Sequence, residues 1–388
     1  MGCHASRDVV SGFEIRKEED QEQHERRTSK GSSSFSSNFS SLGSESELPV
    51  YLQSDMEQVG STASLRFSSH GCQRHNSGKD VIQSSHAFQG AIPFDEEISI
   101  EELGELEPLA AGGFCLICSC VYRGHKAALK IPRPDSPEGV VEDLIEEIHV
   151  YKLISAQGGH RNITRAYGSG LHVQQDQEMP FLLLERLDGG TLHQLLDAPH
   201  LSESVWEDPS YRLEMGLELA EAIHFLHNKT VPGGFVLHRD LKPTNIGLCE
   251  KGCLKVFDLG LSVIQEVKEG RDDKYEMSGM AGSKRFMAPE VCRGLAYNEK
   301  VDVYSFSIVL WEMFTRQKPF LGMSVEEHYR EVMLGGARPP VDPTWPTALQ
   351  DLFECCWDAD PDRRPSILEA RDAIRAILGR EGDGVVEQ

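Results

Sequence analysis

The chain has 388 residues, a formal net charge of −23 and ten cysteines. The charge argues against a nucleic-acid partner, because phosphate backbones are bound by clustered lysine and arginine. No run of eighteen apolar residues is present, so we expect no membrane-spanning helix. The first twenty residues contain no apolar core of a secretion signal, and we therefore expect the cysteines to be reduced thiols of a cytoplasmic protein.

The N-terminal region shows no sustained helical or strand periodicity as far as Phe94. Its segment SKGSSSFSSNFSSLGSES, residues 29–46, is a low-complexity serine tract. Such a composition buries too little apolar surface to offset the loss of chain entropy on folding. We therefore predict that residues 1–97 are disordered.

The first six residues, MGCHAS, match the pattern for myristoylation of Gly2, with Ser6 at the favoured position. Cys3 is then a candidate for palmitoylation. One myristoyl chain binds a bilayer only marginally, with a constant of about 10⁴ M⁻¹, so anchoring needs a second signal. Acylation of both residues predicts tethering to the cytoplasmic face of a membrane, whereas a chance match is the alternative.

Apolar periodicity begins at residue 98 and predicts one folded unit over 98–379, followed by a polar tail, 380–388. Its first part, 98–187, alternates like strands, apart from a helical spacing over 140–155. Its second part, 188–379, is dominated by helical patterns such as VDVYSFSIVLWEMFT. We predict an α+β fold with a small β-rich lobe ahead of a larger α-helical lobe.

Five short motifs follow one another in this unit. They are AALK (127–130), HRDLKPTN (238–245), KVFDLGLS (255–262), MAPE (287–290) and DADPDRRP (358–365). Their order and separations resemble the eukaryotic protein kinases. The resemblance implies a bilobal kinase fold that transfers the γ-phosphate of ATP, with Mg²⁺, to hydroxyl groups of protein substrates. The oligomeric state is not indicated.

The resemblance assigns a role to each motif residue. Phosphoryl transfer passes through a loose transition state, so catalysis depends on positioning and charge neutralisation. Asp240 would accept the proton of the substrate hydroxyl, and Lys242 would contact the γ-phosphate. Asn245 and Asp258 would hold the magnesium ions. Lys130 would contact the α and β phosphates.

A glutamate of the 140–155 helix would hold Lys130 in place. Glu146 and Glu147 are both available. We choose Glu147, because helical spacing then places it on the same inward face as the apolar residues 150, 151 and 154. Glu146 would face solvent.

The resemblance also outlines an adenine pocket. Glu185 and Leu187 would offer backbone groups to the base, and Leu184 would lie at the rear. The roof would consist of Leu109, Ile117 and Ala128. Gly247 occupies the floor, where a leucine is usual, and predicts a deeper pocket.

The segment LAAGGFCLICSC, residues 109–120, departs from the family. Ala110, Gly112 and Cys115 occupy the three positions at which kinases usually carry glycine. Gly112 is the one nearest the phosphates, and the two substitutes are small, so we predict a modified but working clamp. The alternative is a pseudokinase-like nucleotide-binding scaffold, which the intact Lys130, Asp240 and Asp258 disfavour. The MAPE segment disfavours a small-molecule kinase.

Lys242 and Ser283 are the residues that serine/threonine kinases typically carry at these two positions. Within those enzymes, residues 301–313 and 356–366 resemble the tyrosine-kinase-like group. Arg239 beside Asp240 favours control by phosphorylation between Asp258 and Glu290. We expect Ser278 to be the switch, and the other candidates are Tyr275 and Ser283.

Further residues are expected to be structural. Asp302 should bind the backbone of the catalytic loop, and Glu290 should form a buried ion pair with Arg364. His160 and Asn162 should lie in a turn. Cys118 and Cys120 should be small buried hydrophobic residues, because no second cysteine pair is present at the spacing that a zinc site needs.

Overall fold

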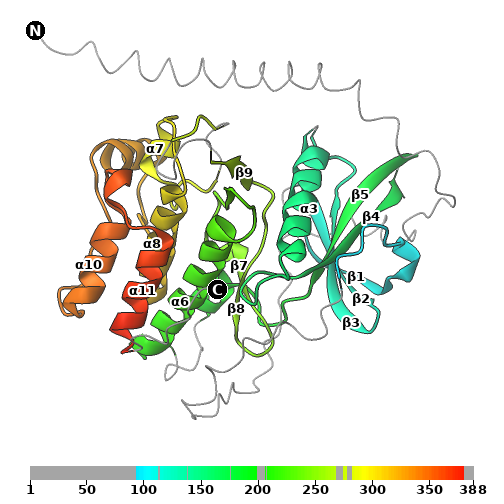
Figure 1. Ribbon diagram of the computed structural model, residues 1–388, viewed down its shortest axis with the longest axis horizontal. Helices are drawn as coiled ribbons and strands as arrows, with labels where there is room; N and C mark the ends of the chain where they lie inside the picture. Colours follow the sequence, from blue (N-terminus) through cyan, green and yellow to red (C-terminus); the bar gives the residue numbers. More distant parts are fainter. Residues whose placement is uncertain are drawn as a thin grey trace, which may run out of the picture.

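The computed structural model describes residues 93–111, 114–137, 139–174, 176–198, 206, 208–267, 274–277 and 282–379. These residues form a strand-rich lobe followed by a helical lobe (Figure 1). The predicted α+β bilobal architecture is therefore confirmed. Gly2, Cys3, Gly112 and Ser278 lie outside the described residues, as does the tail 380–388.

The small lobe is built on an antiparallel five-stranded sheet with the order β1-β2-β3-β5-β4. Its strands are β1 (Gly104–Ala111), β2 (Cys115–Tyr122), β3 (His125–Pro132), β4 (Ala166–Gln174) and β5 (Gln177–Glu185). The two-residue turn between β2 and β3 has Arg123 and Gly124 at positive φ. Such turns match the right-handed twist of the strands that they join.

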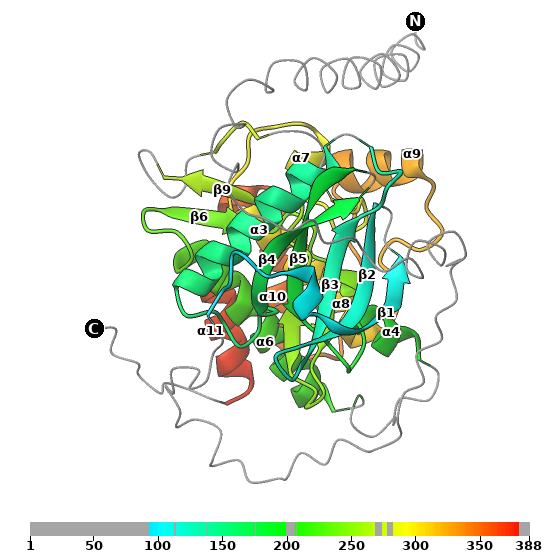
Figure 2. The same cartoon turned by 90° about the vertical axis from the view of Figure 1, so that its right-hand side faces the viewer.

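Helix α3 (Val140–Ala156) packs against β4 and β5 (Figure 2). Its buried positions recur at helical spacing and comprise Val140, Leu144, Glu147, Val150, Tyr151 and Ile154. Glu146 is exposed. The predicted helical face is thus the one that faces the sheet, and it carries a single carboxylate into the interior.

Residues 93–98, the N-terminal strap, pair with β4 in parallel. The Asp95 N–H donates to the Tyr167 carbonyl at 2.9 Å, and the Ser169 N–H donates to the Asp95 carbonyl at 2.9 Å. A Cβ atom at Gly168 would lie 1.9 Å from the Asp95 oxygen, so only glycine permits this approach. The predicted boundary at residue 98 therefore needs correction, because ordered contacts begin before it.

The helical lobe surrounds α8 (Lys300–Thr315), whose residues 301–314 are all buried. A helix that is buried on every side lies at the centre of a lobe. The surrounding elements are α4 (Leu192–Asp197), α6 (Pro209–Asn228), α7 (Pro289–Cys292), α9 (Val325–His328), η3 (Tyr329–Leu334), α10 (Thr347–Cys356) and α11 (Ile367–Ile377). Among the described residues, no helix combines the length and apolar character that crossing a bilayer requires.

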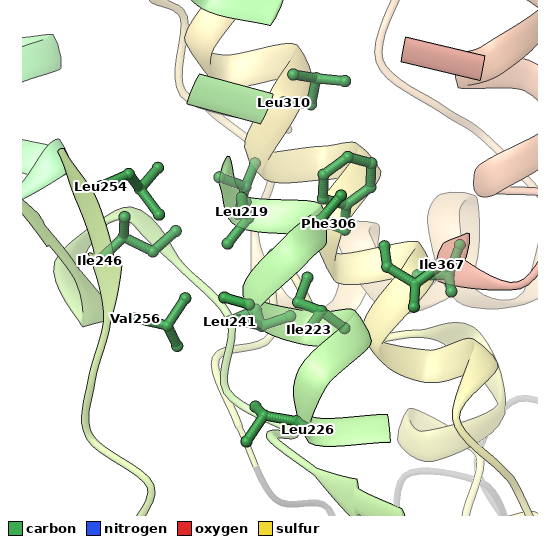
Figure 3. Packing of buried hydrophobic residues seen from close by; sticks show 14 of the residues in the cluster. Leu219, Ile223, Leu226, Leu241, Ile246, Leu254, Val256, Phe306, Leu310 and Ile367 are labelled. Carbon is green, nitrogen blue, oxygen red and sulfur yellow. The ribbon is translucent and has the colours of Figure 1, made fainter. Parts of the chain in front are cut away.

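Two short antiparallel ladders lie on the side of the helical lobe that faces the sheet. They join β6 (Gly234–Leu237) to β9 (Val263–Glu266) and β7 (Ile246–Leu248) to β8 (Leu254–Val256). Figure 3 shows Ile246, Leu254 and Val256 of the second ladder beside the apolar face of α6. This packing fixes the loops that follow β6 and β8, which contain the predicted catalytic residues.

Candidate active site

Lys130 on β3 joins two carboxylates from distant parts of the chain. Its Nζ donates to Glu147 Oε2 at 2.7 Å and to Asp258 Oδ1 at 2.8 Å. Glu147 also accepts the backbone N–H of Leu259 at 3.2 Å. The cluster therefore connects the sheet, helix α3 and the segment after β8, and it includes the lysine–glutamate contact expected for Glu147.

The protonation of this cluster follows from burial and charge. Burial would lower the pKa of Lys130, but the charges of Glu147 and Asp258 raise it above its ordinary value. Burial raises the pKa of Glu147, although Lys130 opposes this effect. For Asp258, burial acts upward, yet the charge and hydrogen bond of Lys130 lower the pKa overall. Asp258 is thus an ionised carboxylate beside a charged lysine.

A second cluster surrounds Asp240 in the loop after β6. Lys242 Nζ donates to Asp240 Oδ2 at 2.6 Å and to Ser283 Oγ at 2.9 Å. Asn245 Nδ2 donates to the same Oδ2 at 3.1 Å and to the Asp240 carbonyl at 3.0 Å. The Ser283 N–H binds Asp240 Oδ1 at 2.8 Å. The three predicted catalytic residues therefore lie together, and the carboxylate is fixed from both sides.

The catalytic loop is anchored by Asp302 at the start of α8. Its carboxylate accepts the N–H groups of His238 at 2.9 Å and Arg239 at 3.0 Å, and it lies 2.8 Å from His227 Nε2. This confirms the structural role predicted for Asp302. The bonds also hold Arg239 at a φ of 63°, a left-handed conformation that a non-glycine residue keeps only when its surroundings impose it.

The two clusters meet where the catalytic loop passes the segment after β8. The Phe257 N–H donates to the Asn245 carbonyl at 3.1 Å, which places Asp258 next to the catalytic loop. Asp258 itself has a φ of 62°. The backbone thus turns sharply at the residue whose carboxylate binds Lys130, and local strain of this kind is common at functional sites.

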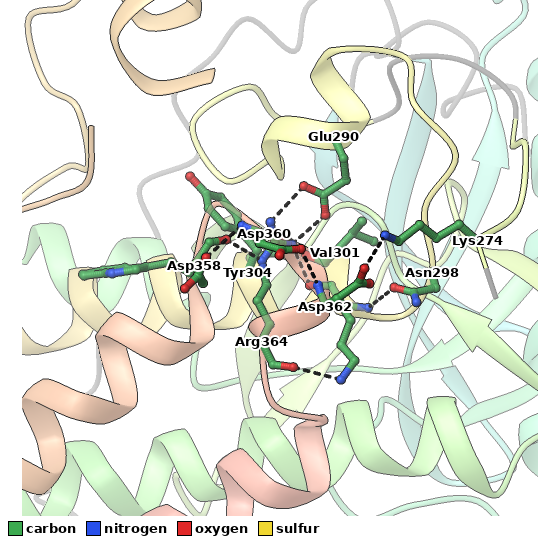
Figure 4. Close-up of polar contacts among 12 residues, drawn as sticks. Lys274, Glu290, Asn298, Val301, Tyr304, Asp358, Asp360, Asp362 and Arg364 are labelled. Carbon is green, nitrogen blue, oxygen red and sulfur yellow. Dashed lines mark hydrogen bonds and ion pairs between the residues drawn. The ribbon is translucent and has the colours of Figure 1, made fainter. Parts of the chain in front are cut away.

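The large lobe contains the predicted ion pair between Glu290 and Arg364 (Figure 4). Two guanidinium nitrogens donate to the two carboxylate oxygens at 2.6 and 2.9 Å. Arg364 also donates to the carbonyls of Asp358 and Lys300. The pair is buried and confirms the expectation from the sequence.

With the exception of Gly247 on β7, the residues predicted to form an adenine pocket lie on the small-lobe sheet and on the segment that follows β5. Leu184 is buried near the end of β5, and the Glu185 N–H donates to the Arg165 carbonyl at 2.8 Å. The roof residues are half-buried on β1, β2 and β3, and they are Leu109, Ile117 and Ala128. The prediction of a deeper floor at Gly247 is wrong. A Cβ atom there would lie 2.3 Å from Leu187 Cδ1, so the leucine after β5 occupies the space.

The structure shows the surroundings of two of the predicted phosphorylation sites, which stay predictions. The hydroxyl of Tyr275 is buried, its ring packs against Phe235, and its backbone pairs with Tyr297. The residue as a whole is half-buried. The Ser283 N–H donates a hydrogen bond to Asp240, and its hydroxyl oxygen accepts one from Lys242. Ser283 therefore belongs to the candidate catalytic centre. The prediction for Ser278 lies outside the described residues.

Two contributors to the site were missed by the sequence analysis. The Leu259 N–H is a backbone donor, and no residue pattern reports such a group. Gly282 was detectable, because it directly precedes Ser283. It has a φ of 111°, and a Cβ atom there would lie 2.4 Å from the Arg239 carbonyl oxygen. Glycine therefore lets this segment reach the catalytic loop.

Comparison with known proteins agrees with this geometry. Residues 103–374 match the model of a family described as protein tyrosine and serine/threonine kinase. The chain is 34% identical over 274 residues to serine/threonine-protein kinase VIK of Arabidopsis thaliana, covering 69% of this chain and 58% of that protein. It is 31% identical over 302 residues to dual specificity protein kinase pyk3 of Dictyostelium discoideum, covering 77% and 21%.

A third relative is mitogen-activated protein kinase kinase kinase 7 of Drosophila melanogaster. It is 30% identical over 289 residues, with coverage of 73% of this chain and 38% of that protein. The chain thus spans less than two thirds of the length of each of these relatives. The family match covers both lobes and all the clustered residues described above. The chain belongs to the protein tyrosine and serine/threonine kinase family.

Proposed function

We propose that this chain is a protein serine/threonine kinase that transfers the γ-phosphate of ATP to hydroxyl groups of protein substrates. The observation that carries the proposal is the fixed carboxylate of Asp240, which Lys242, Asn245 and Ser283 hold next to the Lys130 cluster. The Arabidopsis relative is a serine/threonine-protein kinase, which supports the choice of hydroxyl.

In this proposal Asp240 acts as the general base. Its carboxylate accepts the proton of the substrate hydroxyl, a function that contributes about 10²–10⁴-fold to rate in enzymes generally. The hydrogen bonds from three residues fix its orientation, so the carboxylate does not have to reorganise during the reaction. Lys242 Nζ lies 2.6 Å from Asp240 and can neutralise charge on a phosphate brought to the same place.

The residues present suit Mg²⁺. Asn245 uses its Nδ2 to bind Asp240, which leaves its Oδ1 as the atom able to act as a ligand. Asp258 supplies an ionised carboxylate that is 41% exposed. Carboxylate and amide oxygens are hard ligands of the kind that Mg²⁺ prefers. A bound ion would neutralise phosphate charge, while Lys130 would turn from Asp258 towards the α and β phosphates.

Transfer of radiolabelled phosphate from ATP to casein tests the proposal. Asp240→Asn should lower transfer by about 10²–10⁴-fold. Asp351→Asn is the matched control, because Asp351 is exposed on α10, and it should behave like the wild type. Phosphoamino-acid analysis should identify phosphoserine or phosphothreonine. Equal activity of both variants, or labelled tyrosine alone, would contradict the proposal.

We further propose that Gly2 and Cys3 are acylated and tether the kinase to the cytoplasmic face of a membrane, where it takes part in signalling. The sequence pattern MGCHAS supports this, together with the need for two lipid signals. Gly2→Ala should move the protein from the membrane fraction to the supernatant, whereas His4→Ala should not. A free or acetylated Gly2 in the mass spectrum of the mature protein would exclude the tether.

A further inference from the structure

The hairpin between β7 and β8 places two cysteines opposite each other. Ladder partners in this pair run from Ile246 and Val256 to Leu248 and Leu254, so the next opposed positions are Cys249 and Cys253. The Cys249 N–H donates to the Cys253 carbonyl at 2.9 Å. Directly opposed residues on antiparallel strands have Cβ atoms close enough for their side chains to interact.

The turn that joins the two cysteines is short and well defined. The Gly252 N–H donates to the Cys249 carbonyl at 2.8 Å, and Gly252 has a φ of 76°. This is a three-residue hairpin loop that ends in a glycine bulge. Glu250 and Lys251 at its tip are exposed. The cysteine pair therefore lies just below an open hairpin tip that small oxidants can reach.

The Cys249 sulfur lies against the opposite strand. Cys249 Sγ accepts the backbone N–H of Cys253 at 3.2 Å. Both are free thiols and both are half-buried. Cys118 and Cys120 on β2 differ, because both side chains are buried in the apolar core of the small lobe.

The environment gives the two thiols different acidities. The hydrogen bond from Cys253 lowers the pKa of Cys249 to about 5, with help from the N–H groups of Cys253 and Lys251 and the charge of Lys255, although burial opposes this. The hydrogen bond to Cys249 raises the pKa of Cys253, and burial and Glu218 act in the same direction. The backbone N–H that Cys249 Sγ accepts also stabilises a thiolate at this residue, so Cys249 is the better nucleophile and Cys253 can resolve the oxidised product.

Both strands of the hairpin are held in place. On the β8 side, the Leu254 N–H donates to Glu218 Oε2 at 2.8 Å, and Asn162 Nδ2 donates to the Leu254 carbonyl at 2.9 Å. On the β7 side, the Gly189 N–H donates to the Leu248 carbonyl at 2.9 Å. These bonds come from α6, from the turn after α3 and from the segment joining the lobes, so the opposed cysteines cannot slide apart.

We propose that Cys249 and Cys253 form a redox-sensitive dithiol that closes to an intrachain disulfide on reaction with a hydroperoxide. The Cys249 sulfur attacks the terminal peroxide oxygen, the O–O bond breaks, and the protonated leaving oxygen departs as water or an alcohol. The Cys253 sulfur then attacks the sulfur of the Cys249 sulfenic acid. The S–S bond forms, and the sulfenic hydroxyl takes up a proton and leaves as water. Two thiols lose two electrons and two protons, and one peroxide is reduced.

Peptide mapping of the oxidised protein tests this proposal independently of kinase activity. The full chain is treated with limiting hydrogen peroxide, alkylated and digested with trypsin without reduction. Lys251 lies between the two cysteines, so cleavage after it separates them unless a disulfide joins the fragments. The expected product is a linked pair of peptides that reduction splits. Separate fragments, with alkylated or overoxidised cysteines, would overturn the proposal.

Single variants assign the roles of the two sulfurs. Cys253→Ser should accumulate a sulfenic acid at Cys249 that a dimedone probe labels, whereas Cys249→Ser should give no label at Cys253. Cys355→Ser is the control, because Cys355 is an exposed thiol with a cysteine neighbour and a raised pKa. It should retain the linked peptide pair. Equal labelling of Cys249 and Cys253 in the two single variants would contradict the assignment.

The pH dependence of alkylation provides a measurement on the unmodified chain. A thiol with a low pKa is a weaker nucleophile, so at neutral pH its larger thiolate fraction gives little advantage. At about pH 6 the advantage remains, and iodoacetamide should modify Cys249 roughly tenfold faster than a cysteine with an ordinary or raised pKa. Cys292, which is half-buried and has a raised pKa, is the reference. Equal rates at this pH would overturn the proposed nucleophile.

Discussion

The Glu290–Arg364 pair and the Lys130 cluster contain the same kinds of groups but differ in how completely they are satisfied. Arg364 is fully buried, donates to both oxygens of Glu290 and to two backbone carbonyls, and lies over the ring of Tyr304. Lys130 is instead shared between two carboxylates, and Asp258 remains 41% exposed. The first arrangement has no capacity for another partner. The second can exchange one carboxylate for a phosphate.

We call an ion pair closed when all its polar atoms have buried partners, and open when one partner remains exposed to water. In this molecule that difference, more than charge or sequence separation, distinguishes a structural ion pair from a reactive one. The partners in both clusters come from distant segments and make hydrogen bonds of similar length. A closed pair contributes mainly to folding, because removing one member leaves an unpaired buried charge. An open cluster contributes mainly to chemistry. The four predictions below test this distinction.

The largest expected effect is the loss of the closed pair. Arg364→Met should lower the free energy of unfolding by about 3–5 kcal/mol, because Glu290 is left buried without its partner. Urea denaturation measures the change. Arg363→Met is the matched control, since its side chain is 75% exposed, and it should stay within about 0.5 kcal/mol of the wild type. The double variant Glu290→Leu/Arg364→Met should recover most of the loss, because no unpaired charge remains.

Lys130→Met should affect catalysis more than stability, the reverse of what is expected for Arg364→Met. Phosphate transfer should fall by about 10²–10³-fold, because a charge that stabilises the transition state is removed. The free energy of unfolding should fall less than in Arg364→Met, since Glu147 still accepts the Leu259 N–H and can take up a proton. Single-turnover kinetics and urea denaturation provide the two readings. Lys126→Met, on the same strand but 59% exposed, should change neither appreciably.

Asp302 combines burial with contact to the catalytic loop. Burial acts to raise its pKa, but the hydrogen bond and charge of His227 lower it below the ordinary value of 3.8. In acid the unfolded chain therefore binds more protons than the folded chain. The ionised Asp302 carboxylate stabilises the folded protein fully above pH 3.8, and this stabilisation is lost as the pH falls below 3.8. Asp302→Asn should lower the free energy of unfolding by about 1–3 kcal/mol at neutral pH.

The difference between Asp302→Asn and the wild type should narrow below about pH 4, where the Asp302 carboxylate of the unfolded wild-type chain begins to take up protons while that of the folded chain stays ionised. Urea denaturation at neutral and acidic pH measures both values, and Asp351→Asn serves as the exposed control. A constant difference between the two proteins across this range would show that the ionised carboxylate is not the source of the stability.

The smallest effect is expected from an exposed pair close to the closed one (Figure 4). Lys274 Nζ lies 2.9 Å from Asp362, but the two side chains are 35% and 62% exposed. Lys274→Ala should change the free energy of unfolding by less than about 0.5 kcal/mol, because water screens the pair. A loss as large as that of Arg364→Met would mean that bond length, and not closure, determines the contribution.

The sequence was sufficient for features that local patterns encode. The motif residues Lys130, Asp240, Asn245 and Asp258 lie in connected clusters, as their order predicted. The choice between Glu146 and Glu147 also followed from helical spacing alone, because only one of two adjacent helix positions can face the sheet. Such features depend on the chain within a few turns of the residue, or on a motif that fixes the chemistry.

The failures concern contacts between distant segments. The side chain of Leu187 fills the space beside Gly247. In the sequence, helices α4 and α6 separate these two residues. The hydroxyl of Tyr275 is buried where the ring packs against Phe235 and the backbone pairs with Tyr297, and the sequence around Tyr275 does not encode these contacts. The pairing of Cys249 with Cys253 needed the register of β7 and β8, although the intervening Glu-Lys-Gly turn was a usable signal.

The N-terminal strap has a practical consequence for work with the isolated catalytic region. Strand β4 is the outermost strand of the sheet, and the strap at Asp95 covers its free edge. A protein that begins at residue 103, where the family match starts, would leave the Ser169 N–H without its acceptor and an open strand edge facing solvent. Open edges promote aggregation. Recombinant protein should therefore begin before Phe94 if it is to remain soluble.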